Sequence, residues 1–120
     1  MSAAASETAV LRAQAAYFLA TGVWPLIHMR TFQAVTGPKL EHWLVKTVGA
    51  TVAAIGASLW SAASSTPVRR ETIVLGVGTS AVLGAIDAWY VARRRISPVY
   101  LVDAAAQGAI LAGWAKAGRA

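Results

Sequence analysis

Four long apolar stretches, separated by short polar segments, follow one another along the chain. Two of them contain no Asp, Glu, Lys or Arg and two contain a single aspartate: 13–29, 47–68, 72–92 with Asp87, and 96–115 with Asp103. A helix rises about 1.5 Å per residue, so about 20 apolar residues cross the hydrocarbon core of a bilayer. The pattern predicts an all-α, four-helix transmembrane bundle in which residues 1–120 form a single domain.

Proline marks three of the expected helix starts. Pro38, Pro67 and Pro98 each follow a Gly, Thr or Ser and precede an apolar run. The first helical position tolerates proline because the N–H that proline lacks has no partner there, and Ser, Thr or Gly suits the position before it. A fourth helix is expected to begin near Ser6, with Glu7 in its first turn.

The predicted helices cover about 6–28, 38–62, 67–94 and 98–117, with short connections between them. Pro25 should kink the last turn of the first helix, because it lacks a backbone N–H and its ring clashes with the preceding turn. The longest connection, 29–37, should lie along the membrane interface.

Tryptophan placement supports the membrane interpretation. All five indoles fall near predicted helix ends: Trp24, Trp43, Trp60, Trp89 and Trp114. Indole rings gather where a bilayer meets water. An alanine-rich soluble bundle is the alternative, but such bundles normally carry a continuous charged face on each helix.

Composition narrows the chemistry further. Hydrophobic residues make up 57% of the chain and charged residues 13%, against about 25% charged in soluble domains. The net charge of +6 does not indicate a nucleic-acid partner, because a soluble basic domain would not leave most of its chain apolar. The chain has no cysteine, which excludes thiolate chemistry and disulfides. No phosphate-binding loop, nucleophile elbow or zinc motif is present, so we expect no cofactor and no enzyme activity.

Basic residues are divided almost evenly between the two expected membrane faces, so they do not predict which face is cytoplasmic. Residues 1–27 lack a basic region ahead of their apolar run, which disfavours a cleaved signal peptide. The expected location is a membrane, crossed several times. Expected partners are the lipid bilayer and a second copy or another membrane protein.

Three charged residues fall at a similar depth of the predicted bundle. Lys46, Asp87 and Asp103 lie about 7–12 Å below the helix ends, at 1.5 Å per residue, on the side that holds the 29–37 and 93–97 connections. A charge inside a membrane is costly, so such groups normally pair or face water. We expect Lys46 to pair with one or both aspartates. The alternative for Lys46 is that its long side chain reaches the headgroups.

The helix faces place further polar groups beside these charges. Gly76, Ser80 and Gly84 form a small-residue stripe that would let another helix backbone approach closely, and Asp87 continues it. The predicted ligand or ion pocket comprises Asp103, Asp87, Lys46, Tyr100 and Gln107. The predicted pocket entrance comprises His28, Arg30, Glu41 and His42.

Each candidate also has a structural interpretation. The two aspartates would then fix the bundle through interhelical hydrogen bonds, and the Arg93-Arg94-Arg95 run would anchor lipid headgroups. His28 and His42 have no third ligand at a defined spacing, so no metal site is expected.

The stretches TGVWPLIHMRTFQAVTGPK (21–39), WLVKTVG (43–49) and RISPVYLVDA (95–104) resemble a group of small bacterial four-helix membrane proteins with no established activity. The resemblance implies four spans, a bacterial origin and therefore a location in the bacterial cell membrane, and it assigns no role to any residue.

Three functions fit the sequence. The first is a membrane protein with an interior polar pocket for a small ligand, ion or proton. The second is a non-catalytic structural or accessory subunit. The third is an enzyme acting on a lipid-soluble substrate with an aspartate as acid–base catalyst. A cavity between the helices would favour the first, and a dry, fully paired cluster would favour the second.

Overall fold

The computed structural model describes residues 3–64 and 67–119, and over these residues it contains five α-helices and no strand. They are α1 (Ala3–Ile27), α2 (Met29–Thr36), α3 (His42–Ala62), α4 (Arg70–Ala92) and α5 (Tyr100–Arg119). The expected all-helical class is confirmed.

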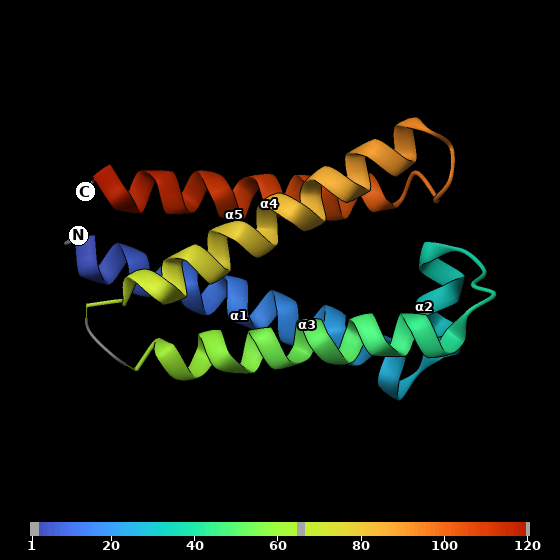
Figure 1. Cartoon of the computed structure of the whole chain (residues 1–120), viewed down its shortest axis with the longest axis horizontal. Coiled ribbons are helices and arrows are strands. Elements are labelled where there is room, and N and C mark those ends of the chain that lie inside the picture. Colours follow the sequence, from blue (N-terminus) through green and yellow to red (C-terminus); the bar gives the residue numbers. More distant parts are fainter. Residues whose placement is uncertain (1–2, 65–66, 120) are drawn as a thin grey trace.

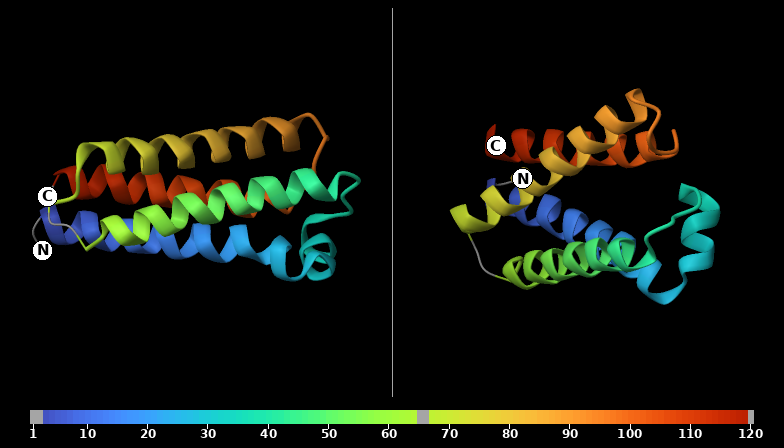
Figure 2. Two further views of the ribbon diagram at one scale, coloured as in Figure 1. Left: turned by 60° about the horizontal axis from the view of Figure 1, so that its bottom comes forward. Right: turned by 45° about the vertical axis from the view of Figure 1, so that its right-hand side comes forward.

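The four long helices form two antiparallel pairs (Figures 1 and 2). α1 packs along α3 and α4 packs along α5, while α1 also contacts α5. α3 and α4 touch over a few residues only. The two chain ends lie together at one end of the molecule and α2 lies at the other (Figure 1). The pairs therefore remain apart along the α3–α4 side of the bundle.

Glycines bring the backbones of α1 and α3 into direct contact. A Cβ atom added to Gly22 would lie 2.6 Å from the Gly49 carbonyl oxygen and 2.6 Å from the Ala53 nitrogen. A Cβ atom on Gly56 would lie 2.9 Å from the backbone nitrogen of Leu19. A larger side chain does not fit at these positions, so small residues are required where the two backbones cross.

The close approach was expected on α4 instead, and that expectation is corrected. The stripe does face inward, but Gly76 packs against the side chain of Gln14 and Gly84 against that of Gln107. Glycine at these positions makes room for a neighbouring amide side chain, whereas at Gly22 and Gly49 it makes room for a backbone.

The expected helix starts at Pro38 and Pro67 are wrong by a few residues. α3 begins at His42 and α4 at Arg70, so each proline lies in the connection before its helix. At Pro98 the chain forms a turn in which Ser97 Oγ accepts from the Val99 N–H at 3.3 Å. α5 follows from that turn.

The segment 29–37 was expected to be a connection, and it contains a helix. His28 Nδ1 accepts a hydrogen bond from the Thr31 N–H at 3.2 Å and caps the start of α2. Gly37 ends it, with a φ of 101° that residues bearing a Cβ rarely adopt. Phe32 of α2 packs edge-on against Trp24, with ring centroids 5.3 Å apart. This contact holds α2 against the end of α1, which ends at Ile27, two residues after Pro25.

The apolar core lies toward the end that holds the chain termini. It comprises Leu11, Ala15, Phe18, Leu59, Ala63, Val68 and Trp114. Gln14 is fully buried among these residues, and its amide is fully hydrogen bonded. Its Nε2 donates to the Gly76 carbonyl at 2.7 Å and to Ser80 Oγ at 2.9 Å, and its Oε1 accepts from Trp114 Nε1 at 2.8 Å.

The placement of Trp114 corrects the expectation that all five indoles lie at a membrane interface. Trp114 is 6% exposed and its N–H is bonded inside the bundle. Trp43, Trp60 and Trp89 are exposed, as an interfacial position requires. Position near a helix end does not separate a core indole from an interfacial one, because the core itself extends to this end of the bundle.

Within the part of the chain that the structure describes, two helices, α3 and α4, are long and apolar enough to cross a membrane. α1 and α5 are richer in alanine and are not among the helices that meet the same standard of length and composition. Large apolar side chains are exposed along α3 and α4, including Leu44, Val48, Val74, Val82 and Ile86.

Candidate functional site

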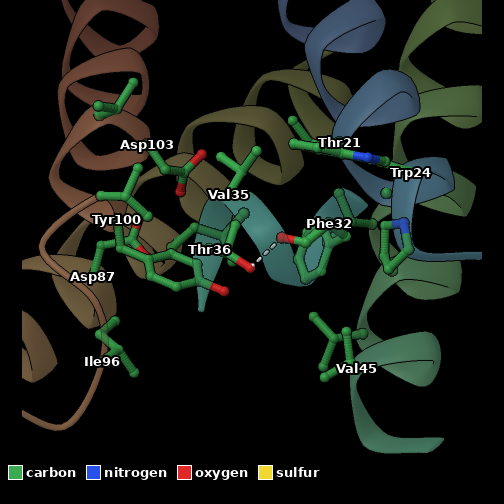
Figure 3. A pocket seen from close by; sticks show the side chains of 18 of the residues that line it. Thr21, Trp24, Phe32, Val35, Thr36, Val45, Asp87, Ile96, Tyr100 and Asp103 are labelled. Carbon is green, nitrogen blue, oxygen red and sulfur yellow. Dashed lines mark hydrogen bonds between the residues drawn. The ribbon is translucent and has the colours of Figure 1, made fainter. Parts of the chain in front are cut away.

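A cavity of about 620 Å³ lies between the two helix pairs, at the α2 end of the molecule. Its lining is mostly apolar and comes from all five helices. Figure 3 shows Asp87, Tyr100 and Asp103 on one side of the cavity, with Trp24 and Phe32 across from them. Ligand cavities in proteins commonly have volumes of about 300–1,000 Å³ with a few polar groups in an apolar wall.

The position of the cavity follows from the packing. Gly22 and Gly49 bring α1 and α3 together on one side, whereas α3 and α4 meet over only a few residues. α2 and the turn after it lie across the end of the resulting gap and contribute Phe32 and Thr36 to its wall. The cavity is therefore a consequence of the two-pair architecture.

One wall of the cavity carries a hydrogen-bonded group of polar side chains from α1 and α5. The Tyr17 hydroxyl donates to Asp103 Oδ1. Gln107, one turn along α5, donates from Nε2 to the same oxygen at 3.3 Å. The Asp87 carboxyl group, on α4, faces that of Asp103. Three helices thus converge on one carboxylate.

Two acceptor atoms in this wall have no hydrogen-bond partner among the described residues. They are Asp87 Oδ2 and Gln107 Oε1. Asp87 is 7% exposed and Gln107 is 1% exposed, and both side chains line the cavity. Buried polar groups normally find partners. These two acceptors are unsatisfied in the wall, where the surrounding side chains cover both atoms almost completely.

Lys39 lies at the α2 end of the cavity. Its Nζ donates to the Thr36 carbonyl at 3.2 Å and sits 4.8 Å from the centroid of the Tyr100 ring. This cation–π contact joins the turn after α2 to the start of α5. The ammonium group is therefore engaged with a carbonyl and an aromatic ring rather than with a carboxylate.

The structure brings together four of the five predicted pocket residues: Asp87, Tyr100, Asp103 and Gln107 all line the cavity. Lys46 does not, and its expected pairing with an aspartate is corrected. Its side chain is exposed and makes no ion pair with either aspartate in the described structure. The cavity face of α3 carries Val45, Val48, Gly49 and Val52. Lys46 follows Val45 directly, and one residue turns a helix by about 100°.

None of the four predicted entrance residues lines the cavity, which corrects that assignment. Instead they are exposed, and three of them hydrogen bond locally. His28 bonds to Thr31, His42 Nε2 lies 3.3 Å from Gln33 Oε1, and Glu41 Oε2 accepts from the Trp43 indole at 2.8 Å. Arg30 is exposed on α2. The unpredicted helix α2 contributes to the error, because His28 caps it and Arg30 lies on it, while Thr36 and Lys39 are the residues that line the cavity.

Three residues of the polar interior were not predicted: Gln14, Tyr17 and Lys39. A signal for Gln14 exists in the sequence, since Leu11, Gln14, Phe18 and Gly22 recur at helical spacing along the buried face of α1. Tyr17 lies outside that series. The position of Lys39 depends on the turn after α2, for which the sequence pattern offers no comparable signal.

No group of three or more His, Asp or Glu that could hold a metal ion occurs among the residues searched, which are those the structure describes. Comparison with protein-family models, with curated proteins and with solved structures finds no match.

Proposed function

We propose that this chain is a four-span bacterial membrane protein that binds a small, largely apolar molecule in the cavity between its helix pairs. The spans are α1, α3, α4 and α5. The observation that carries the binding proposal is the 620 Å³ cavity, whose apolar lining ends at the polar wall of Tyr17, Asp103 and Gln107.

Three features support the membrane location. α3 and α4 have the length and composition of spans. The molecule is 45 Å long, close to the thickness of about 40–45 Å of a bilayer with its headgroups. The apolar side chains exposed along α3 and α4 would be costly in water, because each leaves apolar area hydrated. At the α2 end, Arg93 lies over the Trp89 ring, 5.6 Å from its centroid, a pairing suited to the headgroup layer.

Cysteine labelling tests the four-span topology, and the absence of native cysteine makes the assay direct. Single variants Ser64→Cys, Val82→Cys and Arg95→Cys would be treated with a membrane-impermeant maleimide in sealed vesicles of uniform orientation. Positions 64 and 95 should lie on opposite faces, so we expect only one of the two to be labelled in intact vesicles. Position 82 should be labelled only after the membrane is dissolved. Rapid labelling of Val82→Cys in intact vesicles would contradict the membrane location.

Matched substitutions test the binding site. Val48 lines the cavity and Val82 does not, while the two side chains are 50% and 56% exposed. We expect saturable binding of 4-phenyl-1-butanol to the protein in phosphatidylcholine nanodiscs, measured by calorimetry with empty discs subtracted. Val48→Trp should abolish that binding and Val82→Trp should retain it. Equal effects of the two variants, or no saturable binding to the wild type, would contradict a ligand site.

Binding fits the cavity better than the accessory-subunit alternative. The closest helix contact, at Gly22 and Gly49, is used within the chain, so it is not available to a partner helix. A dry cluster that only fixes the bundle would have its acceptors paired, whereas Asp87 Oδ2 and Gln107 Oε1 are unpartnered in the described structure.

We also favour binding over catalysis. The carboxyl pair could in principle transfer protons to a lipid-soluble substrate. However, the donors that face Asp103 hold its carboxylate in place, and the described cavity-lining residues include no serine, cysteine or histidine. The arrangement therefore suits recognition of a ligand.

A further inference from the structure

We propose that the ligand carries a protonated primary or secondary amine, held between Asp87 and Gln107, on an apolar body that fills the rest of the cavity. This inference rests on the proposed function and deepens it, because it names the chemical class that the cavity selects.

The balance of donors and acceptors in the polar wall points to a ligand that donates. The Tyr17 hydroxyl and the Gln107 amide nitrogen are donors, and both are directed at Asp103. The unpartnered atoms, Asp87 Oδ2 and Gln107 Oε1, are acceptors. A ligand that offered another acceptor would leave all of them unsatisfied, whereas N–H groups would satisfy them once the Asp87 and Gln107 side chains turn toward the cavity.

The charge balance points to a cation. The carboxyl groups of Asp87 and Asp103 face each other, and Asp87 is 7% exposed. Lys39, the one lysine or arginine lining the cavity within the described structure, rests on the Thr36 carbonyl and the Tyr100 ring. Lys46 is exposed. Two facing carboxyl groups repel each other when both are ionised, so such a pair holds either a shared proton or a cation. The ammonium group of the ligand would take the place of that proton.

The cavity selects against a bare metal ion. Hard cations take six or more oxygen ligands, and no group of three carboxylate or imidazole side chains surrounds this site in the described residues. A volume of about 620 Å³ with a mostly apolar lining instead accommodates an alkyl or aryl body. Leu83 and Ile86 of α4 and Val48 and Val52 of α3 contribute to that lining.

Three probes that share one apolar body separate the contributions. 4-Phenylbutylamine carries charge and N–H donors, trimethyl(4-phenylbutyl)ammonium carries charge alone, and 4-phenyl-1-butanol carries a hydroxyl without charge. Affinities would be measured by calorimetry in nanodiscs of zwitterionic phosphatidylcholine, with empty discs subtracted. We expect the primary amine to bind about tenfold more tightly than the alcohol, as for a buried charge-assisted contact, and the quaternary ammonium to bind more weakly than the amine.

A matched pair of α4 variants locates the contact. Asp87→Asn should bring the amine-to-alcohol affinity ratio close to one. Glu71→Gln, which removes an exposed carboxylate in the first turn of the same helix, should leave the ratio as in the wild type. The ratio also separates recognition from a general loss of structure, since it compares two ligands in one preparation.

Each outcome decides one of the proposals. If the alcohol binds as tightly as the amine in the wild type, the cavity stands as a ligand site and the amine inference is overturned. Equal binding of the quaternary and primary ammonium probes would overturn the role of N–H donors. An unchanged ratio in Asp87→Asn would overturn the assignment to Asp87. If no probe saturates, the proposed function itself fails. The wild-type comparison needs no variant, so the test holds even if Asp87→Asn does not fold.

Discussion

The Tyr17 hydroxyl donates a hydrogen bond to the carboxylate of Asp103, across the contact between α1 and α5. This bond links the α1–α3 pair to the α4–α5 pair at the cavity wall. Gln107 supports the same carboxylate from one turn along α5. The wall thus has a structural part, built on Asp103, and an unpartnered part at Asp87 and Gln107 Oε1.

Removal of the Tyr17 hydroxyl should loosen this link. We expect Tyr17→Phe to lower the free energy of unfolding by about 1–3 kcal/mol, because it takes a donor from a partly buried carboxylate. Unfolding in mixed micelles titrated with dodecyl sulfate would measure the change. Tyr90→Phe is the control, since the Tyr90 side chain is exposed. Equal losses in the two variants would show that the Tyr17–Asp103 bond contributes nothing measurable.

The glycine contact between α1 and α3 gives a second prediction. Gly22→Ala should destabilise the bundle by about 1–3 kcal/mol or more, since its Cβ would overlap backbone atoms that cannot rotate away. Gly78→Ala and Gly108→Ala add a Cβ where nothing lies within 4 Å, and each should stabilise its helix by up to about 1 kcal/mol. A stable Gly22→Ala variant would mean that α1 and α3 do not cross here.

The buried amide of Gln14 gives a third prediction. Trp114→Phe keeps an aromatic ring but removes the N–H that Gln14 Oε1 accepts. The resulting unpaired acceptor should cost about 1–3 kcal/mol in the same unfolding assay. Trp60→Phe provides the comparison, because the Trp60 side chain is half exposed. A larger loss of unfolding free energy in Trp60→Phe would contradict the stabilising role of the Gln14–Trp114 hydrogen bond.

The end of α4 carries a strained residue that a substitution should relieve. Arg94 has a φ of 58°. Its N–H bonds to the Val91 carbonyl at 3.0 Å, and the Arg95 N–H bonds to the Tyr90 carbonyl at 2.9 Å, which is the pattern of a helix ended by a left-handed residue. Because glycine adopts this conformation without strain, Arg94→Gly should raise the free energy of unfolding by about 1 kcal/mol. The neighbouring Arg95→Gly should show no such gain.

Much of the helical framework could be predicted from the sequence, because four long apolar stretches and their proline-marked starts are local signals. The inward face of α4 was also predictable, since Gly76, Ser80 and Asp87 share one side of a helix. The errors at Lys46 and at Trp114 have a common origin. The depth of a residue along its helix follows from its position in the sequence. The direction in which its side chain points relative to the bundle depends on how neighbouring helices pack.

The candidate site was predictable on α4 and α5 and not on α1 or α2. Tyr100, Asp103 and Gln107 lie along one face of a single helix, so their grouping needed no tertiary information. Tyr17 and Asp103 are 86 positions apart in the sequence, and no local pattern encodes their contact. Lys39 depends on α2, a short helix fixed by the His28 cap and Gly37. Such a helix leaves little trace in a pattern dominated by long apolar runs.

Photo-crosslinking tests the central claim, that the cavity between the helix pairs holds an amphiphilic amine, most directly. A 4-phenylbutylamine bearing a diazirine on its ring would be activated in nanodiscs, and the modified residues mapped by tandem mass spectrometry. We predict labelling of Leu83 and Ile86, which line the cavity, and loss of that labelling when unmodified 4-phenylbutylamine is in excess. Labelling confined to Val74 and Val82, which are exposed and do not line the cavity, and unaffected by the competitor would contradict the account.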